Sequence, residues 1–316
     1  MGTTYIIQYQ GKNPEEIQFG IDSLLKFINL DVSTYELNST ISNFNKTTRD
    51  FSTEEKLHPH FLANLVASQK VYKETDGYFD PTLGPIIQYW GFGTNKNFPQ
   101  KIDSAKVKRL NQSTGLDNVK IEDLGDIIYF RKLNRNVQLD FSAIAKGYAV
   151  DLIADYVEEK GIENYYVEIG GELTINGVNA SELPWTIGVS TPDPKAPADD
   201  ISAQFMPKAS VATSGNYRNY YEFQDQKFGH TIDPKSGFPV MTNLLSATVF
   251  HESCTMADAY ATAFMSMGLS KALHTATKLE GVEYLFIYID ENNILSKQHS
   301  SGVFDMIPSS GNDAEE

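Results

Sequence analysis

The spacing of apolar residues along the chain predicts three long helices in its first half. Residues 14–30 carry apolar side chains three and four positions apart, which is the spacing of one helix face. A second helix is predicted over residues 53–75, with Pro59 near its start. The strongest helical pattern covers residues 142–160, and Gly161 is expected to end it.

The other elements predicted by the pattern are shorter. Further helices are expected at residues 103–110, 255–267 and 270–279. Strands are expected at residues 2–9, 165–169, 185–189, 202–206 and 282–289. Residues 127–139 are expected to form a hairpin that turns at 133–136. Because helices and strands intermix without strict β-α-β alternation, the order favours an α+β fold over a doubly wound sheet.

Length and composition fit one large domain. The chain has 316 residues, of which 41% are hydrophobic, and shows no internal repeat or low-complexity linker. We expect residues 1–308 to form a single domain and residues 309–316 to be a flexible polar tail.

Charge and cysteine usage exclude several classes of function. The formal net charge is −15, and no Lys/Arg-rich run offsets it, so nucleic-acid binding is not expected. Cys254 is the sole cysteine, which excludes an intrachain disulfide and a cysteine-based zinc site. No apolar run reaches the length of about 18 residues that spans a membrane. No signal-peptide pattern follows Met1, so the protein is cytoplasmic or a targeting segment has been removed.

Two glycine-containing segments have the composition of ligand-binding loops. Residues 77–85 and 90–93 combine Gly and Pro with aromatic residues, which suits either a close approach to a ligand or a structural turn. Residues 140–148 run from Asp140 into a helix start that carries Lys146. Free N–H groups at a helix start attract phosphate, although Ser142 could serve only as an N-cap.

Two later segments carry candidate chemistry. The turn-rich segment 229–239 includes His230, which is either a proton carrier or a structural histidine. Asp258 and Thr262 are four residues apart and therefore project from one helix face among alanines. Their oxygens suit Mg²⁺, and the alternative is an ordinary surface Asp with a back-bonded Thr. A Gly170-Gly171 pair could allow close ligand approach or form a bulge.

In their order along the chain, these segments resemble the ApbE-type FAD:protein FMN transferases over nearly the whole sequence. The matching motifs are Met1-Gly2-Thr3, Ser33-Thr34-Tyr35 with Ser39 and Asn45, Phe79 to Pro85, Trp90 to Gly93, Asp140 to Gly147, Gly170-Gly171, Thr213 to Gly215, His230 to Pro239, and Ala257 to Thr262. The resemblance implies an ApbE-like α+β fold, related to the T-fold, in which antiparallel sheets pack with helices.

The resemblance also implies the ligands of the site. Mg²⁺ would be held by the Ala143 carbonyl, Asp258 and Thr262, and His230 and Asp258 would be catalytic. FAD, the substrate, would contact a larger set of residues. These are Met1, Tyr35, Phe79, Asp80, Asp140, Lys146, His230 and Ile232.

The activity implied is transfer of FMN from FAD to a Thr or Ser hydroxyl of an acceptor protein, with release of AMP. The alternatives are a Mg²⁺-dependent FAD pyrophosphatase that uses water, and a flavin-binding protein without catalysis. The family resemblance implies a location in the cell envelope or periplasm, with any targeting segment absent from this sequence, and a cytoplasmic location is the alternative.

Overall fold

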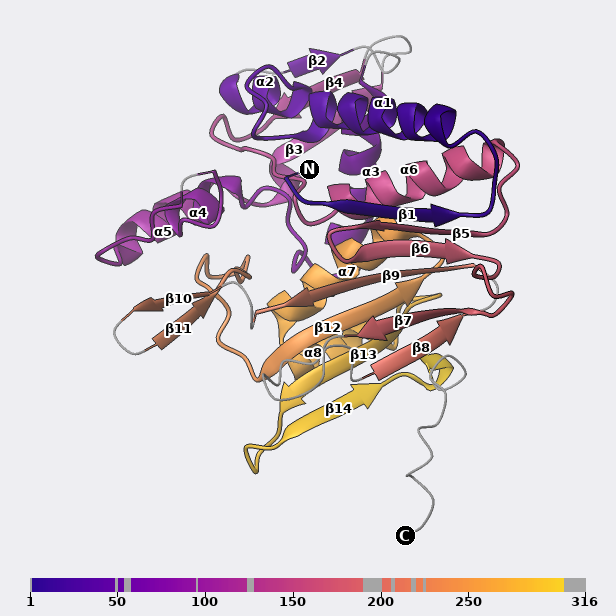
Figure 1. The fold of residues 1–316 in the computed structure, drawn as a ribbon. Helices are drawn as coiled ribbons and strands as arrows, with labels where there is room; N and C mark the ends of the chain where they lie inside the picture. The colour runs from indigo at the N-terminus through magenta and orange to yellow at the C-terminus, as the bar shows by residue number, and fades with distance from the viewer. Residues whose placement is uncertain are drawn as a thin grey trace.

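The computed structural model describes residues 2–48, 51–53, 58–94, 96–123, 128–189, 201–205, 208–216, 220–223 and 226–303. Met1 and the predicted tail at 309–316 lie outside these residues. The centre of the molecule is a seven-stranded sheet in the order β1-β5-β6-β9-β12-β13-β14, and every neighbouring pair is antiparallel (Figure 1).

The strands of this sheet come from both halves of the chain. In sequence order they are β1 (Tyr5–Tyr9), β5 (Tyr165–Ile169), β6 (Glu172–Asn176), β9 (Ala209–Gly215), β12 (Leu244–His251), β13 (Glu283–Ile289) and β14 (Leu295–His299). The α+β fold with antiparallel pairing predicted from the sequence is therefore confirmed.

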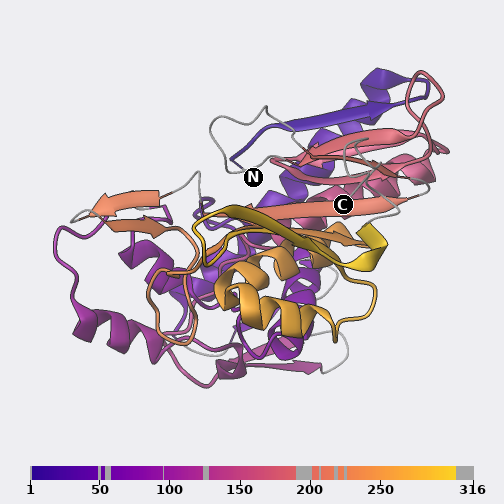
Figure 2. The same ribbon diagram turned by 90° about the horizontal axis from the view of Figure 1, so that it is seen from below.

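Helices cover one face of the sheet in two layers (Figures 1 and 2). The layer against the strands consists of α6 (Ala145–Glu159), α7 (Cys254–Met267) and α8 (Leu269–Ala276). Outside it lie α1 (Pro14–Val32), α2 (Thr40–Lys46) and α3 (Pro59–Glu74). Among the described residues, no helix is both long and apolar enough to cross a lipid bilayer.

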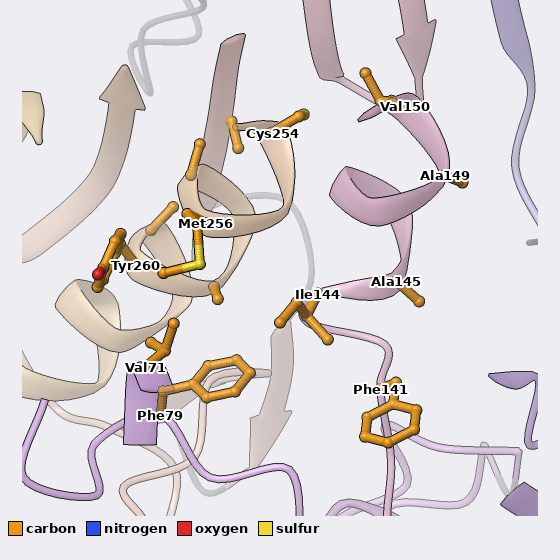
Figure 3. Packing of buried hydrophobic residues seen from close by; sticks show 14 of the residues in the cluster. Val71, Phe79, Phe141, Ile144, Ala145, Ala149, Val150, Cys254, Met256 and Tyr260 are labelled. Carbon is orange, nitrogen blue, oxygen red and sulfur yellow. The ribbon is translucent and has the colours of Figure 1, made fainter. Parts of the chain in front are cut away.

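The main hydrophobic core fills the space between these helices and the sheet. Figure 3 shows part of it, with Ile144 at the start of α6, Met256 on α7, and Phe79 from the loop after α3. All of α7 except Thr262 is buried, because its alanines allow neighbouring helices and strands to approach closely. The site residues predicted on α7, Asp258 and Thr262, therefore lie on a closely packed helix.

The opposite face of the sheet is covered by a two-stranded ribbon of β7 (Trp185–Val189) and β8 (Ile201–Phe205). Ile187 and Val189 of β7 pack there against Val211, Phe250 and Leu285 in a second core cluster. This cluster fixes the end of β7 beside the strands that lead to the cavity described below.

A third core cluster lies in a smaller lobe at one side of the molecule (Figure 1). The lobe contains α4 (Gly84–Tyr89), α5 (Ser104–Asn111), β10 (Tyr220–Phe223) and β11 (Gln226–Gly229). Trp90 is fully buried at its centre, stacks on Phe228, and donates its indole N–H to the Gly237 carbonyl. One ring thus ties together segments that are far apart in sequence.

A three-stranded sheet, β2 (Phe51–Thr53), β4 (Ile128–Lys132) and β3 (Val119–Asp123), corrects the hairpin predicted at residues 127–139. β4 pairs with β2 on one edge and β3 on the other, so no edge remains for residues 137–139. Instead, the Asn45 side chain bonds both the N–H and the carbonyl of Leu139.

Most of the predicted helices are confirmed, with one clear error in their boundaries. The helix predicted at 53–75 begins only at Pro59, and residues 51–53 form β2 instead. Proline is favoured as the first residue of a helix because it has no N–H to leave unpaired. The helix predicted from residue 142 starts at Ala145, after a turn that presents the Ala143 carbonyl.

Candidate functional site

A cavity of about 910 Å³ lies between the smaller lobe and the sheet-and-helix body. Its walls come from the loop after α3, the start of α6, the β5–β6 turn, the end of β9, the segment after β11, and α7. These segments are distant from one another in sequence, and each is held in place by contacts of its own.

The start of α6 is held against the loop after α3. The Asp140 N–H donates to the Pro81 carbonyl at 2.7 Å, and the Asp140 carboxylate accepts from the Ser142 N–H at 2.8 Å. This turn places Ala143 and Lys146 on the cavity wall.

The start of α7 is held by a carboxylate from α6. Asp151 accepts hydrogen bonds from the N–H groups of Cys254 and Thr255 and from the hydroxyls of Ser253 and Thr255. These bonds satisfy N–H groups that a helix start otherwise leaves unpaired. They also fix the register of α7 against α6.

Gly147 allows α6 and α7 to touch. A Cβ at this position would lie 2.2 Å from the Cys254 carbonyl oxygen and 2.9 Å from the Asp258 Cβ. The Gly147 N–H donates to Asp258 Oδ2 at 3.1 Å. In a regular helix this N–H would reach back to the carbonyl four residues earlier, which belongs to Ala143.

The bond from Gly147 to Asp258 leaves two oxygens unclaimed. Among the residues that the structure describes, none donates a hydrogen bond to the Ala143 carbonyl or to Asp258 Oδ1. Asp258 is only 2% exposed, so its carboxylate is largely shielded from water. Thr262, one turn further along α7, contributes a hydroxyl that lies 3.2 Å from the Ser214 hydroxyl.

Lys146 lies between two buried carboxylates. Its Nζ is 3.2 Å from Glu172 Oε1 and 3.5 Å from Asp258 Oδ2. Burial alone would lower the pKa of Lys146, but Asp258 and Glu172 together hold it above its ordinary value. Burial raises the pKa of Glu172 to about 8, against the opposing effect of Lys146 and with the help of Asp258. Glu172 Oε2 is buried and has no hydrogen-bond partner among the described residues.

The other wall of the cavity is aromatic. Phe92 packs against Tyr221, with 5.1 Å between ring centroids, and approaches His230 edge-on at 6.3 Å. The Tyr221 hydroxyl donates to the carbonyls of Gly91 and Lys96 and so ties β10 to the loop after α4. This wall is therefore apolar and fixed, whereas the α6–α7 wall is charged.

The structure brings most of the sequence-predicted site residues to this cavity. Those that line it are Phe79, Asp80, Asp140, Ala143, Lys146, His230, Ile232, Asp258 and Thr262. Tyr35 is not among the lining residues and is 65% exposed, and Met1 is outside the described residues. The individual roles of all these residues stay predictions.

Two of the lining residues have clear structural tasks. The Asp80 carboxylate accepts from the N–H and hydroxyl of Thr82 and from the Gly115 N–H, so it folds its own loop. Burial raises the pKa of Asp80 despite these bonds. The Phe79 side chain belongs to the main core and is 2% exposed.

The sequence reasoning did not single out two residues that shape the cavity, Glu172 and Tyr221. Glu172 directly follows the Gly170-Gly171 pair and begins β6. An acidic residue at the start of a buried strand could have indicated a site, because a carboxylate is costly to bury without a partner. Tyr221 gave no such signal, because it reaches the cavity only through the pairing of β10 with β11.

The residues present fit a hard divalent cation better than a transition metal. No cluster of three or more His, Cys, Asp or Glu side chains placed to hold a metal occurs within the described part of the chain. The oxygens that Ala143, Asp258 and Thr262 bring to the cavity are instead a carbonyl, a carboxylate and a hydroxyl, which are ligand types that Mg²⁺ accepts.

Comparison with known proteins gives consistent matches over nearly the whole chain. The sequence model of the ApbE family matches residues 1–286. The chain is 32% identical to an FAD:protein FMN transferase of Haemophilus influenzae, over 95% of this chain and 88% of that protein. It is 35% identical to one from Vibrio cholerae, over 87% and 82%.

Solved structures match as well. The flavin transferase ApbE from Vibrio cholerae superposes with a TM-score of 0.85 at 31% identity, covering 97% of this chain and 96% of that one. The apo form of the flavinyl transferase ApbE from Pseudomonas stutzeri gives 0.82 at 30% identity, covering 96% and 93%.

Proposed function

The chain belongs to the ApbE family, and we propose that it is an FAD:protein FMN transferase that moves FMN from FAD to a Thr or Ser hydroxyl of an acceptor protein. The observation that carries this proposal is the contrast between the two walls of one cavity. Unclaimed oxygens and Lys146 form one wall, while Phe92 and Tyr221 form the other. A flavin dinucleotide needs both, because it joins an apolar ring system to a pyrophosphate.

Mg²⁺ is the cation that we propose for the charged wall. The Ala143 carbonyl, Asp258 and the Thr262 hydroxyl would hold it. When bound, it neutralises charge on the pyrophosphate, which carries about two negative charges and must enter a protein of net charge −15. Lys146 supplies a further positive charge on the same wall.

The transfer is a displacement at phosphorus. The acceptor hydroxyl oxygen forms a bond to the phosphorus of the FMN half, and the bond from that phosphorus to the bridging oxygen breaks. AMP leaves with the bonding electron pair, and the hydroxyl proton passes to a base. We assign this proton to His230, which lines the cavity beside Phe92. Asp140, whose carboxylate accepts the Ser142 N–H, is proposed to fix FAD instead of taking the proton.

The test is transfer of labelled FMN to an acceptor peptide, scored as label that survives denaturation. Asp258→Ala is expected to lower transfer at least about 1000-fold, because it removes the buried carboxylate from the proposed cation site. EDTA is expected to have the same effect on the unmodified protein. Asp155→Asn, an exposed acid on α6, serves as the control and should transfer normally.

Two outcomes would contradict the proposal. Full transfer by Asp258→Ala, or in EDTA, would remove the cation from the mechanism. Rapid release of FMN and AMP from FAD alone, with no label on the peptide, would make the protein a pyrophosphatase that uses water.

A further inference from the structure

The ammonium group of Lys146 lies among oxygens, as a bound cation would. It is within 3.5 Å of Asp258 Oδ2, 3.2 Å of Glu172 Oε1 and 3.4 Å of the Ser142 carbonyl. We propose that Lys146 is a stand-in for the divalent cation: its ammonium lies beside Asp258 when no divalent cation is bound. Glu172 is then the positioning residue that keeps the Lys146 ammonium in the cavity when the ammonium moves away from Asp258. This inference rests on the proposed function.

The contacts of Lys146 are unequal in a way that suits such an exchange. Its distance to Asp258 is the longest of the three, and that oxygen also accepts the Gly147 N–H. Its contact with Glu172 is shorter, and Glu172 is nearly as buried as Asp258. A lysine side chain has several rotatable bonds, so its ammonium can leave Asp258 and stay beside Glu172.

The cost of burying two carboxylates explains why a stand-in cation would be needed. Asp258 and Glu172 are 2% and 5% exposed, and two neighbouring buried carboxylates without a cation are costly. Lys146 offsets only part of this cost, since burial still holds the pKa of Glu172 at about 8. A divalent cation on Asp258 would take over part of this task and free the ammonium for the pyrophosphate. Glu172 lines the same cavity, and its buried Oε2, which has no hydrogen-bond partner among the described residues, can accept the displaced ammonium.

The first experiment measures Mg²⁺ binding to the FAD-free protein by isothermal titration calorimetry. Lys146→Met is expected to tighten Mg²⁺ binding at least about fivefold, since no internal cation must be displaced. Lys96→Met removes the same charge from the same cavity at an exposed residue that, in the described part of the chain, forms no ion pair with either carboxylate. This control should change the affinity less than about twofold.

The second experiment is a double-mutant cycle that isolates Glu172. The titrations are done at about pH 9, so that the Glu172 carboxylate, with its pKa of about 8, is ionised. Glu172→Gln leaves Asp258 as the only carboxylate for Lys146, so Mg²⁺ binding is expected to weaken about fivefold. With Lys146→Met already present, Glu172→Gln should change it less than about twofold.

The results separate this inference from the proposed function. Equal Mg²⁺ affinity in the unmodified protein and Lys146→Met would overturn the stand-in role alone. Equal effects of Glu172→Gln in both backgrounds would show that Glu172 attracts the cation directly, and would overturn its positioning role. If Lys146→Met does not fold, Lys146→Gln takes its place in both experiments, and an unchanged affinity in Glu172→Gln alone also overturns the inference. Absence of Mg²⁺ binding with FAD present would instead contradict the proposed function.

Discussion

Two lysines of this protein, the buried Lys132 and the half-buried Lys146, have opposite surroundings. The Lys132 ammonium donates to the carbonyls of Phe44, Thr47 and Val137 at 2.7–3.0 Å and lies 4.1 Å from the centre of the Phe44 ring. Burial lowers its pKa to about 8. Lys146 meets two carboxylates at longer distances, and they raise its pKa.

The difference separates a lysine that joins parts of the fold from a lysine that is proposed to act in the cavity. Around Lys132, three neutral carbonyls converge on one ammonium and join α2 to β4 and the segment after it. Around Lys146, acceptors outnumber donors, because Glu172 Oε2 and Asp258 Oδ1 receive no hydrogen bond from the described residues. Excess buried acceptors indicate a place where another positive group binds.

Within this comparison, the largest combined effect on stability and transfer is expected from Gly147→Ala, which would disturb the contact of α6 with α7 beside Lys146. The added Cβ would lie 2.2 Å from a backbone oxygen of α7, so the two helices would have to separate. We expect the free energy of unfolding to fall by about 3 kcal/mol and transfer to fall about 100-fold. Urea unfolding and the labelled-FMN assay measure the two changes.

Gly84→Ala is the matched control for this substitution. A Cβ there would meet its nearest neighbour at 3.7 Å, which is an ordinary contact. Near-normal stability of Gly147→Ala would show that α6 and α7 tolerate separation.

The second prediction concerns the Lys132 region. Lys132→Met removes the ammonium donor that the Phe44, Thr47 and Val137 carbonyls share, and is expected to lower the free energy of unfolding by about 3 kcal/mol. FAD affinity of the folded protein should not change, since Lys132 is not on the cavity wall. Lys120→Met, at an exposed position of β3, is the control. A large loss of FAD affinity in Lys132→Met would show that Lys132 also contributes to FAD binding, so that the two lysines do not differ in this respect.

A third basic group, His60, extends the comparison to the pH dependence of stability. Its Nδ1 lies 3.0 Å from the Tyr148 hydroxyl, and burial lowers its pKa while Asp31 opposes this effect. Between the lowered folded pKa and the unfolded value of 6.5, the unfolded chain binds more protons. The stability that the neutral His60 ring contributes is therefore fully present above pH 6.5. It is lost as the pH falls from 6.5 through the lowered pKa of the folded protein.

His60→Gln should remove part of this loss on acidification, as measured by thermal unfolding between about pH 7.5 and pH 5. His274→Gln, on α8, is the control. An unchanged pH dependence in His60→Gln would mean that burial of this ring does not penalise its charge.

The smallest effect is expected from Ser214→Ala. Ser214 lies 3.2 Å from the Thr262 hydroxyl and belongs to the cavity wall. Removing it costs one hydrogen bond, so we expect transfer to change about threefold and stability by less than about 1 kcal/mol. A loss as large as that of Asp258→Ala would assign Ser214 a direct part in the reaction.

The sequence predicted the parts of the site that lie on strongly patterned elements. Asp258 and Thr262 could be placed on one helix face because α7 has a clear helical pattern among small residues. β12 was not predicted, because it is buried on both faces and includes Ser246 and Thr248, so its residues do not alternate. The pairing of Lys146 with Glu172 could not be predicted, since it depends on how α6 packs on the start of β6.

The helix pair α6–α7 has a consequence for the protein during its synthesis. Lys146 and Asp258 are separated by more than a hundred residues, and Asp151 anchors the start of α7 only after that segment exists. A ribosome releases the N-terminal part first, so the growing polypeptide holds the lysine long before its acidic partner. The contact between Gly147 and Asp258 can therefore form only after α7 has been synthesised.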